Sequence, residues 1–475
     1  MIKAFALKCF SIGLLACNAP SVLAQTTPAK FQQALSKLLQ DEQLKHATVG
    51  IYVVNSKTGK PVLAHNEQQG LAPASTLKVI TAATAYELLG SNFRYRTPIR
   101  LIGSKVGDGF VGNVTIDASG DPTLGSFRFA ATSLEELSRR IVAALKQKGI
   151  QKLSGHLLIN ESNWEYMAMP NGWIWEDIGN YYGAAAHAFN WHENSFNLIL
   201  QPGKRVGDSV RIVATKPEMQ NISWINHLLT AKAGSGDNAI IYLPPFAHQA
   251  LVNGTVPAGE NFFTIKGAIA HPAPVFLQDL QQALHSKGID CHLEPADEVM
   301  EQQVMPASSL EQELLTEIQS PILDSMVYWF LQNSINLYGE ALLKTMALQK
   351  SGRGTTDSGV ALLQKFWANQ GLDLSALNIK DGSGLSPANR ITAHSLVTVL
   401  ANAKGKPWFP SFYHGLPLIN GIKMKSGAIQ NVRSYTGYIK SAGGDEYCFA
   451  FVINNYHGSA TAIKNKMFAL LNVFK

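Results

Sequence analysis

A long stretch rich in short strand patterns interrupts the chain and separates an N-terminal segment from a C-terminal segment that both carry helix and strand patterns. A strand hairpin at residues 46–65 and a helix at residues 72–89 come first. Short strand patterns punctuated by Gly, Pro, Asn and Asp then fill residues 95–306. Helices and strands return afterwards. We therefore predict an α/β (α+β) domain made of residues 25–94 and 307–475, interrupted by a large β-rich inserted region of one or two small domains.

The second half is expected to begin with a helix that Ser320 caps and Pro321 enters in its first turn. Apolar spacing and alternation then predict the elements that complete the domain. They are helices at 323–332 and 338–348, strands at 421–425, 434–440 and 447–454, and a final helix at 460–473.

The N-terminus is typical of a secretory signal peptide. Lys3 and Lys8 precede an apolar run, and Ala24 ends a stretch of small residues that a signal peptidase reads. The apolar run is shorter than the roughly 20 residues that span a bilayer. We expect residues 1–24 to be removed and the mature chain to lie in the periplasm, with peripheral membrane association at most. A lipoprotein anchored through Cys17 is the alternative.

Composition excludes several classes of protein. The chain has 475 residues, 46% of them hydrophobic and 16% charged, which suits a packed protein of two or three domains. The net charge of +6 is spread without a Lys/Arg run, so nucleic-acid binding is not indicated. The 13 histidines show no ligand spacing, and neither a metal nor a cofactor is expected. Cys291 and Cys448 remain after export, and two separate thiols are preferred to a disulfide.

Ser75 and Lys78 form the first motif with chemical meaning. A serine hydroxyl needs a neighbouring base to become a nucleophile, and residues three apart share one face of a helix. A lysine that is removed from water can lose its proton and serve as that base. Alone, this spacing is more often a solvated lysine on a helix surface.

Two further motifs lie near the C-terminal half. Ser334 and Asn336 follow an apolar helix, where Ser334 could relay a proton and Asn336 could orient Lys78 and hold a substrate amide. Helix capping is the plainer interpretation. The third motif is the segment 425–427, Lys-Ser-Gly, on an expected edge strand, where a small glycine lets a substrate backbone add to the sheet.

Each of these three motifs is weak evidence alone, but their order and spacing together resemble a known pattern. S-x-x-K, S-D-N and K-T-G occur in this order in class A β-lactamases and penicillin-binding proteins. The chain resembles the low-molecular-mass class C penicillin-binding proteins, which are DacB-like D-alanyl-D-alanine carboxypeptidases and endopeptidases with a long insertion after the first motif. Five more segments resemble signatures of that family: 73–78, 120–124, 182–184, 194–198 and 381–386.

The resemblance implies a penicillin-binding transpeptidase-like fold and a set of site residues. Ser75 would be acylated, Lys78 would act as base, and Ser334 and Asn336 would assist. Lys425, Ser426 and Gly427 would bind the terminal carboxylate, and the backbone N–H groups of Ser75 and Ala428 would form the oxyanion hole. Peptidoglycan stem peptides would be the substrates and β-lactam antibiotics the inhibitors.

The sequence also departs from the family pattern. Ile335 stands where Asp is best known, Ser426 where Thr is commoner, and Pro387 where many relatives carry Arg, which leaves Arg390 as a candidate substitute. In the insertion, the family similarity points to a cluster that grips the free ammonium of the stem peptide. Its expected members are Trp173, Trp175, Asp177 and Tyr182.

Three functions remain open from the sequence. The leading one is a serine-type D-Ala-D-Ala carboxypeptidase that also acts as an endopeptidase on crosslinks. The second is a β-lactamase or esterase of the same Ser-Lys class, which the long insertion disfavours. The third is a catalytically silent wall-binding scaffold, which the complete set of site residues disfavours. The oligomeric state stays undetermined.

Overall fold

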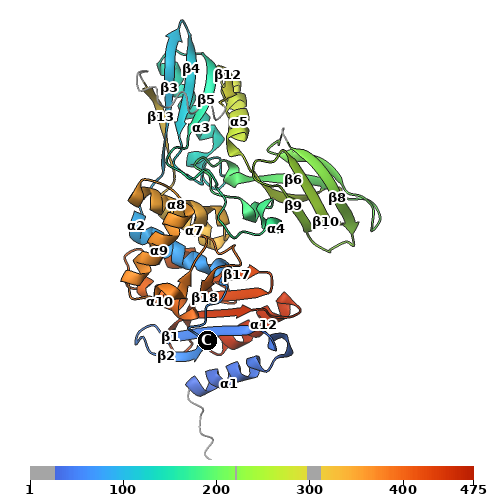
Figure 1. Ribbon diagram of the computed structural model, residues 1–475, viewed down its shortest axis with the longest axis vertical. Helices are drawn as coiled ribbons and strands as arrows, with labels where there is room; N and C mark the ends of the chain where they lie inside the picture. Colours follow the sequence, from blue (N-terminus) through green and yellow to red (C-terminus); the bar gives the residue numbers. More distant parts are fainter. Residues whose placement is uncertain (1–26, 220–221, 297–311) are drawn as a thin grey trace, which may run out of the picture.

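The computed structural model describes residues 27–219, 222–296 and 312–475. The expected signal peptide, residues 1–24, and Cys17 lie outside these ranges. Figure 1 shows an elongated molecule with one sheet at its lower end, a group of helices in the middle, and further sheets above and to one side.

A six-stranded antiparallel sheet forms the lower part of the molecule, in the order β16-β17-β18-β19-β1-β2. The N-terminal hairpin thus joins the C-terminal strands, as the patterns at the two ends of the chain predicted. The strands are β1 (Thr48–Asn55), β2 (Pro61–His65), β16 (Leu418–Ile419), β17 (Ile422–Ile429), β18 (Val432–Lys440) and β19 (Glu446–Asn454).

Helices cover both faces of this sheet, and each face has its own apolar core. On one face, Phe31 and Met467 bring α1 (Thr27–Leu39) and α12 (Ala460–Asn472) against the strands. On the other face, five longer helices pack around Leu77 and Phe330. They are α2 (Lys78–Leu89), α7 (Leu323–Gln332), α8 (Asn336–Ser351), α9 (Thr356–Asn369) and α10 (Ala393–Ala403), followed by the short α11 (Phe409–Gly415). The mixed α/β (α+β) architecture agrees with the predicted fold class.

The expected helix cap at Ser320 is wrong. Helix α7 begins at Leu323, and its N-cap is Ile322, whose side chain makes no capping hydrogen bond. Ser320 instead accepts a hydrogen bond from the backbone N–H of Tyr95 at 2.9 Å and donates one to the carbonyl of Pro321. Its hydroxyl therefore links the segment that leaves the helical part, at Tyr95, to the segment that returns to it, at Pro321.

The intervening region contains a five-stranded sheet, β12-β5-β4-β3-β13, with two helices beside it (Figure 1). The strands are β3 (Arg96–Val106), β4 (Gly109–Asp117), β5 (Lys152–Asn160), β12 (Asp290–Pro295) and β13 (Gln312–Gln319), and the helices are α3 (Leu134–Gln147) and α5 (Pro272–Ser286). Antiparallel pairing of β13 with β3 extends this sheet beyond residue 306, where the sequence suggested the region would end.

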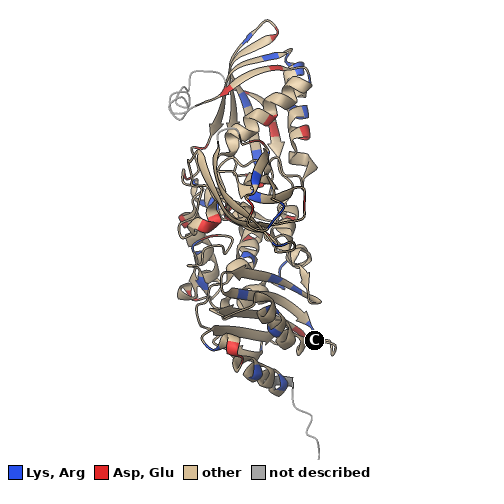
Figure 2. Cartoon of the chain, turned by 90° about the vertical axis from the view of Figure 1, so that its right-hand side faces the viewer, with Lys and Arg blue, Asp and Glu red and all other residues tan. Residues whose placement is uncertain are grey.

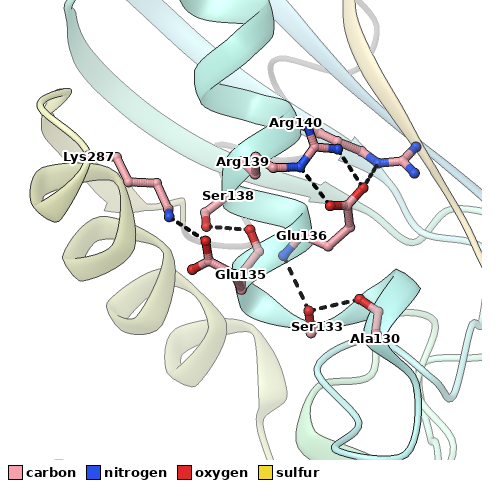
Figure 3. Close-up of polar contacts among 8 residues, drawn as sticks. All are labelled: Ala130, Ser133, Glu135, Glu136, Ser138, Arg139, Arg140 and Lys287. Atoms are coloured by element: carbon pink, nitrogen blue, oxygen red, sulfur yellow. Dashed lines mark hydrogen bonds and ion pairs between the residues drawn. The ribbon is translucent and has the colours of Figure 1, made fainter.

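Local side-chain contacts fix the start of α3. Ser133 accepts a hydrogen bond from the N–H of Glu136, and Glu136 binds both Arg139 and Arg140 one turn later (Figure 3). Lys287, just after α5, binds Glu135 at 2.8 Å. These contacts hold α3 beside α5 on the five-stranded sheet.

Two three-stranded sheets form the rest of the region, in the orders β11-β6-β7 and β8-β10-β9. Their strands are β6 (Ser195–Gln201), β7 (Arg211–Lys216), β8 (Ser223–Ala231), β9 (Asn238–Tyr242), β10 (Gln249–Pro257) and β11 (Phe263–Ala268). The short helix α4 (Trp175–Ile178) lies next to β9, on the side that faces the helical part (Figure 1).

Charge is dispersed over the molecule. Figure 2 shows Lys and Arg interspersed with Asp and Glu along its length. Within the described ranges, no helix is long and apolar enough to cross a membrane. Cys291 on β12 and Cys448 on β19 belong to different sheets, and both are free thiols. The preference for separate thiols therefore agrees with the structure.

Candidate active site

Ser75 lies in a 3-10 turn, Ala74–Leu77, that leads directly into α2. The turn begins with Ala74 in the left-handed backbone region, at a φ of 47°. A residue with a Cβ atom adopts this conformation at a cost, and such strain persists where the surrounding structure holds it. The strained turn presents Ser75 at the N-terminal end of the helix.

Lys78 meets three oxygen atoms. Its Nζ donates to Asn336 Oδ1 at 2.6 Å and to the carbonyl of Ser383 at 2.7 Å, and it lies 2.9 Å from Ser75 Oγ. The first two neighbours can only accept. A neutral amine has two N–H donors and one lone pair, so donation to Asn336 and Ser383 leaves that lone pair for the Ser75 hydroxyl.

Burial favours the neutral form of this lysine. Lys78 is fully buried, which lowers its pKa to about 7, although the charges of Asp381 and Glu340 act in the opposite direction. The Nζ also lies 5.9 Å from the centre of the Phe330 ring. The protein therefore supplies a base beside Ser75 near neutral pH.

The second motif lies between two helices, as expected. Asn336 is the first residue of α8, and its Nδ2 donates to the carbonyl of Tyr182 at 2.7 Å. This bond directs Oδ1 toward Lys78 and ties α8 to the inserted region. Ser334 precedes it with a φ of 57°, a second strained residue at the same site.

The third motif lies on β17, beside the turn that carries Ser75. Within the part of the chain that the structure describes, β16 pairs only with Ile422 and Lys423, so β17 from Lys425 onward is open on that side. Lys425 is buried, and its Nζ donates to the carbonyl of Ser426 at 2.9 Å. Burial, together with the nearby charge of Lys78, lowers the pKa of Lys425 well below its usual value.

Gly427 has a packing role that the sequence did not indicate. A Cβ atom there would stand 2.8 Å from the backbone nitrogen of Ser75, 2.7 Å from the carbonyl oxygen of Pro73 and 2.3 Å from Ser434 Oγ. The glycine is therefore required by the close approach of β17 to the Ser75 turn, in addition to any contact with a substrate on the open edge.

A buried loop holds the Ser383 carbonyl that Lys78 contacts. The carboxylate of Asp381 accepts hydrogen bonds from the backbone of Gly384 and Ser386 and from Asn389 Nδ2, at 2.6–2.9 Å. It also accepts one from Trp173 Nε1 at 3.0 Å. Four donors around one fully buried carboxylate keep the loop in a single conformation.

A cavity of about 890 Å³ opens at Ser75. The inserted region and the helical part both contribute to its wall. Its described lining includes Ser75, Asp177, Tyr181, Tyr182, Ser334, Asn336, Leu385, Pro387, Ala428 and Gln430. The structure therefore gathers Ser75, Ser334, Asn336, Ala428 and Asp177 around one space, with Lys78 and Lys425 buried behind it.

The two tryptophans of the expected ammonium-binding cluster lie outside the cavity lining that the structure describes. Trp173 is buried against Asp381, and Trp175 is 50% exposed and stacks on Tyr242 at 5.9 Å. Neither is among the cavity-lining residues. Asp177 does line the cavity, and burial, with a smaller effect of the Glu176 charge, raises its pKa to about 6.

The structure places Arg390, the candidate substitute for the arginine that many relatives carry, outside the described cavity lining. Its guanidinium donates to the carbonyls of Pro387 and Asn389, at 2.5 and 2.8 Å, and Arg390 is not among the residues described as lining the cavity.

Glu340 is a site residue that the sequence reasoning missed. It is fully buried on α8, and its Oε2 accepts the backbone N–H of Gly382 at 2.9 Å. Burial, reinforced by the charge of Asp381, raises its pKa to about 8. A signal was present, since Glu340 and Lys344 stand four residues apart in an otherwise apolar helix pattern.

Comparisons with known proteins agree with this geometry. The D-alanyl-D-alanine carboxypeptidase of Actinomadura sp. is 25% identical over 484 residues, which cover 93% of this chain and 85% of that protein. The D-alanyl-D-alanine carboxypeptidase DacB of Haemophilus influenzae is 23% identical over 442 residues, or 88% of each chain.

The fold matches solved structures as well. The crystal structure of penicillin binding protein 4 (dacB) from Haemophilus influenzae superposes with a TM-score of 0.76 at 20% identity, over 93% of this chain and 99% of that one. The same protein in complex with a β-lactam gives a TM-score of 0.71. The profile of the D-Ala-D-Ala carboxypeptidase 3 (S13) family matches residues 31–473, and the chain is a member of that family.

Proposed function

We propose that this member of the family removes the terminal D-alanine from peptidoglycan stem peptides through an acyl-enzyme on Ser75. The observation that carries the proposal is the arrangement at Lys78, where two acceptor oxygens hold the amine with its nitrogen 2.9 Å from Ser75 Oγ. This arrangement suits a serine nucleophile activated by a neutral lysine.

The proposed reaction forms an acyl-enzyme and then hydrolyses it. Lys78 takes the hydroxyl proton as Ser75 Oγ bonds to the carbonyl carbon of the penultimate D-Ala. The N–H groups of Ser75 and Ala428 bind the oxyanion, each contributing about 3 kcal/mol in comparable hydrolases. The carbon–nitrogen bond then breaks, and the proton held by Lys78 passes through the Ser334 hydroxyl to the departing amine, which leaves both side chains neutral. A water molecule then bonds to the acyl carbon as the carbon–Oγ bond breaks, and the proton that the water gives up returns to Ser75 Oγ.

Substrate binding is assigned to the open edge of β17 and to the wall of the cavity. Lys425, Ser426 and Gly427 would bind the terminal carboxylate along the open edge of β17. Asp177 would bind the free ammonium of the stem peptide. The cavity of about 890 Å³ also includes Gln430 and Ile240 in its lining, and this space would accept crosslinked peptides, where the leaving group is larger than D-Ala.

We also propose a discontinuous peptidase domain and an N-terminal export signal. The peptidase domain would comprise residues 25–94 and the chain after the insertion, and residues 1–24 would direct the protein to the periplasm. Sequencing the N-terminus of the mature protein from the periplasmic fraction tests the second proposal. A mature chain that begins near Gln25 is expected, and one that begins at Cys17 would show a lipoprotein.

The deciding experiment is incubation of the purified mature protein with a fluorescent penicillin, followed by intact mass and peptide mapping. A stable adduct on Ser75 is expected, together with release of D-Ala from Nα-acetyl-L-Lys-D-Ala-D-Ala. Ser75→Ala should lose both activities, whereas Ser235→Ala, at an exposed position, should keep them.

Two results would contradict the proposal. Rapid loss of penicillin without an adduct would identify a β-lactamase. Intact penicillin without an adduct would identify a silent scaffold.

A further inference from the structure

A second hollow lies behind the active-site cavity. Two adjoining cavities of about 290 Å³ and 470 Å³ share the residues Tyr166, Phe246, Ala270, His271 and Pro274. Both volumes are close to or within the roughly 300–1,000 Å³ of small-molecule sites. We call this space, with its five shared residues, the aromatic hollow.

Three separate parts of the inserted region build the aromatic hollow. Tyr166 follows β5, Phe246 lies between β9 and β10, and His271 is the N-cap of α5. The rings of Tyr166 and Phe246 stack at 5.2 Å, and His271 lies 5.6 Å from Phe246 at a tilt. Tyr166 is 66% exposed and Phe246 46% exposed, so the stack presents ring surface to the outside.

The stack is held in place by an unusual backbone. Phe246 has a φ of 62°, in the left-handed region, which costs a bulky residue energy. An exposed aromatic ring that is held in a strained conformation at the rim of a cavity fits a binding role better than a role in the core.

Polar groups surround the rings, and two histidines among them, His187 and His271, favour the uncharged form. Burial lowers the pKa of His187 to about 3, with a smaller effect of Lys344, and burial also lowers the pKa of His271. His248 and Gln278 line the same hollow. Two carboxylate side chains, Glu161 and Glu218, line the hollow as well. Aromatic faces with hydrogen-bond donors and acceptors at their edges suit a ring that has an apolar face and several hydroxyl groups, which describes a pyranose.

One chain segment separates the aromatic hollow from the active site. Ile178 and Gly183 line the hollow, while their neighbours Asp177 and Tyr182 line the cavity of Ser75. The carbonyl of Tyr182 also accepts the hydrogen bond from Asn336. Only the segment 177–183 would therefore separate a ligand in the aromatic hollow from a stem peptide bound in the active-site cavity.

We propose that the aromatic hollow binds an N-acetylated pyranose of the peptidoglycan glycan strand, to which the stem peptide is attached. This inference rests on the proposed function, because that function supplies a substrate carrying both a peptide and a sugar. Binding the sugar would hold the strand while its peptide reaches Ser75.

The test measures binding of chitotetraose, the β-1,4-linked tetramer of N-acetylglucosamine, to the full mature protein by calorimetry. A dissociation constant on the order of 1 mM is expected. Tyr166→Ala should weaken binding by about fivefold or more, since a lost ring contact costs roughly 1 kcal/mol. Tyr166→Phe should retain it. Phe262→Ala, at another exposed ring of the same region, serves as the matched control.

A kinetic comparison separates this site from the catalytic one. Tyr166→Ala should raise the KM for a disaccharide pentapeptide by a similar factor and leave sugar-free Nα-acetyl-L-Lys-D-Ala-D-Ala and penicillin acylation unchanged. Absence of chitotetraose binding, or equal binding by Tyr166→Ala and the wild type, would overturn the sugar site. Failure of the proposed function would appear separately, as missing acylation of Ser75.

Discussion

Gly427 lies so close to Ser75 that a Cβ atom at residue 427 would stand 2.8 Å from the Ser75 backbone nitrogen. Carbon atoms do not approach backbone that closely, so β17 or the Ser75 turn would have to move. The contact couples the open strand edge to the nucleophile and makes the spacing between them depend on one residue.

Gly427→Ala should therefore lower the second-order rate of penicillin acylation by about tenfold or more, because small misplacements at a reacting centre are costly. Gly443→Ala is the control, since its nearest neighbour would be Ser441 Oγ at 3.8 Å. Stopped-flow fluorescence with a labelled penicillin measures both. Wild-type acylation by Gly427→Ala would show that the turn adapts freely.

Lys78 should make acylation depend on pH. Its pKa is about 7 in the folded protein, and only the neutral amine accepts the serine proton, so the rate should rise with pH through about 7 and then level off. Lys78→Arg, whose side chain stays charged, should acylate about a hundredfold more slowly or worse. Lys350→Arg, on an exposed part of α8, should match the wild type. A flat profile from pH 5 to 9 would refute a titrating base.

Asp177→Asn tests recognition of the ammonium group. We expect the KM for Nα-acetyl-L-Lys-D-Ala-D-Ala to rise by about fivefold, as for a partly exposed ion pair of about 1 kcal/mol. The Nα,Nε-diacetylated peptide should show no change. Because the Asp177 pKa is about 6, the wild-type preference for the free amine should weaken as the pH falls below 6. An equal change for both peptides would mean that Asp177 only shapes the cavity.

The same substitution at Trp173 and at Trp175 should change the free energy of unfolding by different amounts. Trp173→Phe removes a hydrogen bond to the buried Asp381 carboxylate and should lower the free energy of unfolding by roughly 1–3 kcal/mol. Trp175→Phe changes a half-exposed ring and should cost less than about 0.5 kcal/mol. Urea denaturation gives both values, and peptide KM values should stay unchanged. The reverse order of stabilities would contradict a stabilising role for the hydrogen bond between Trp173 and Asp381.

Sequence periodicity was enough to locate the halves of the peptidase fold. Alternation along β1 and β19 and the apolar face of α7 are local patterns that the chain carries by itself. The helical spacing of Ser75 and Lys78 is local too, so their contact could be predicted. The end of the insertion could not, because β13 belongs to the five-stranded sheet only through its pairing with the distant β3.

The residue types that could do the chemistry are evident from short stretches of the chain: a serine three residues before a lysine, a Ser-x-Asn motif and a Lys-Ser-Gly strand. How these residues act depends on long-range packing. The low pKa of Lys78 comes from burial among segments far apart in the chain, opposed by Asp381 and Glu340. The same long-range packing places Trp173 against the buried Asp381 carboxylate and Gly427 against the backbone of Ser75. Solvation and close contact depend on neighbours in space, and a linear pattern does not specify them.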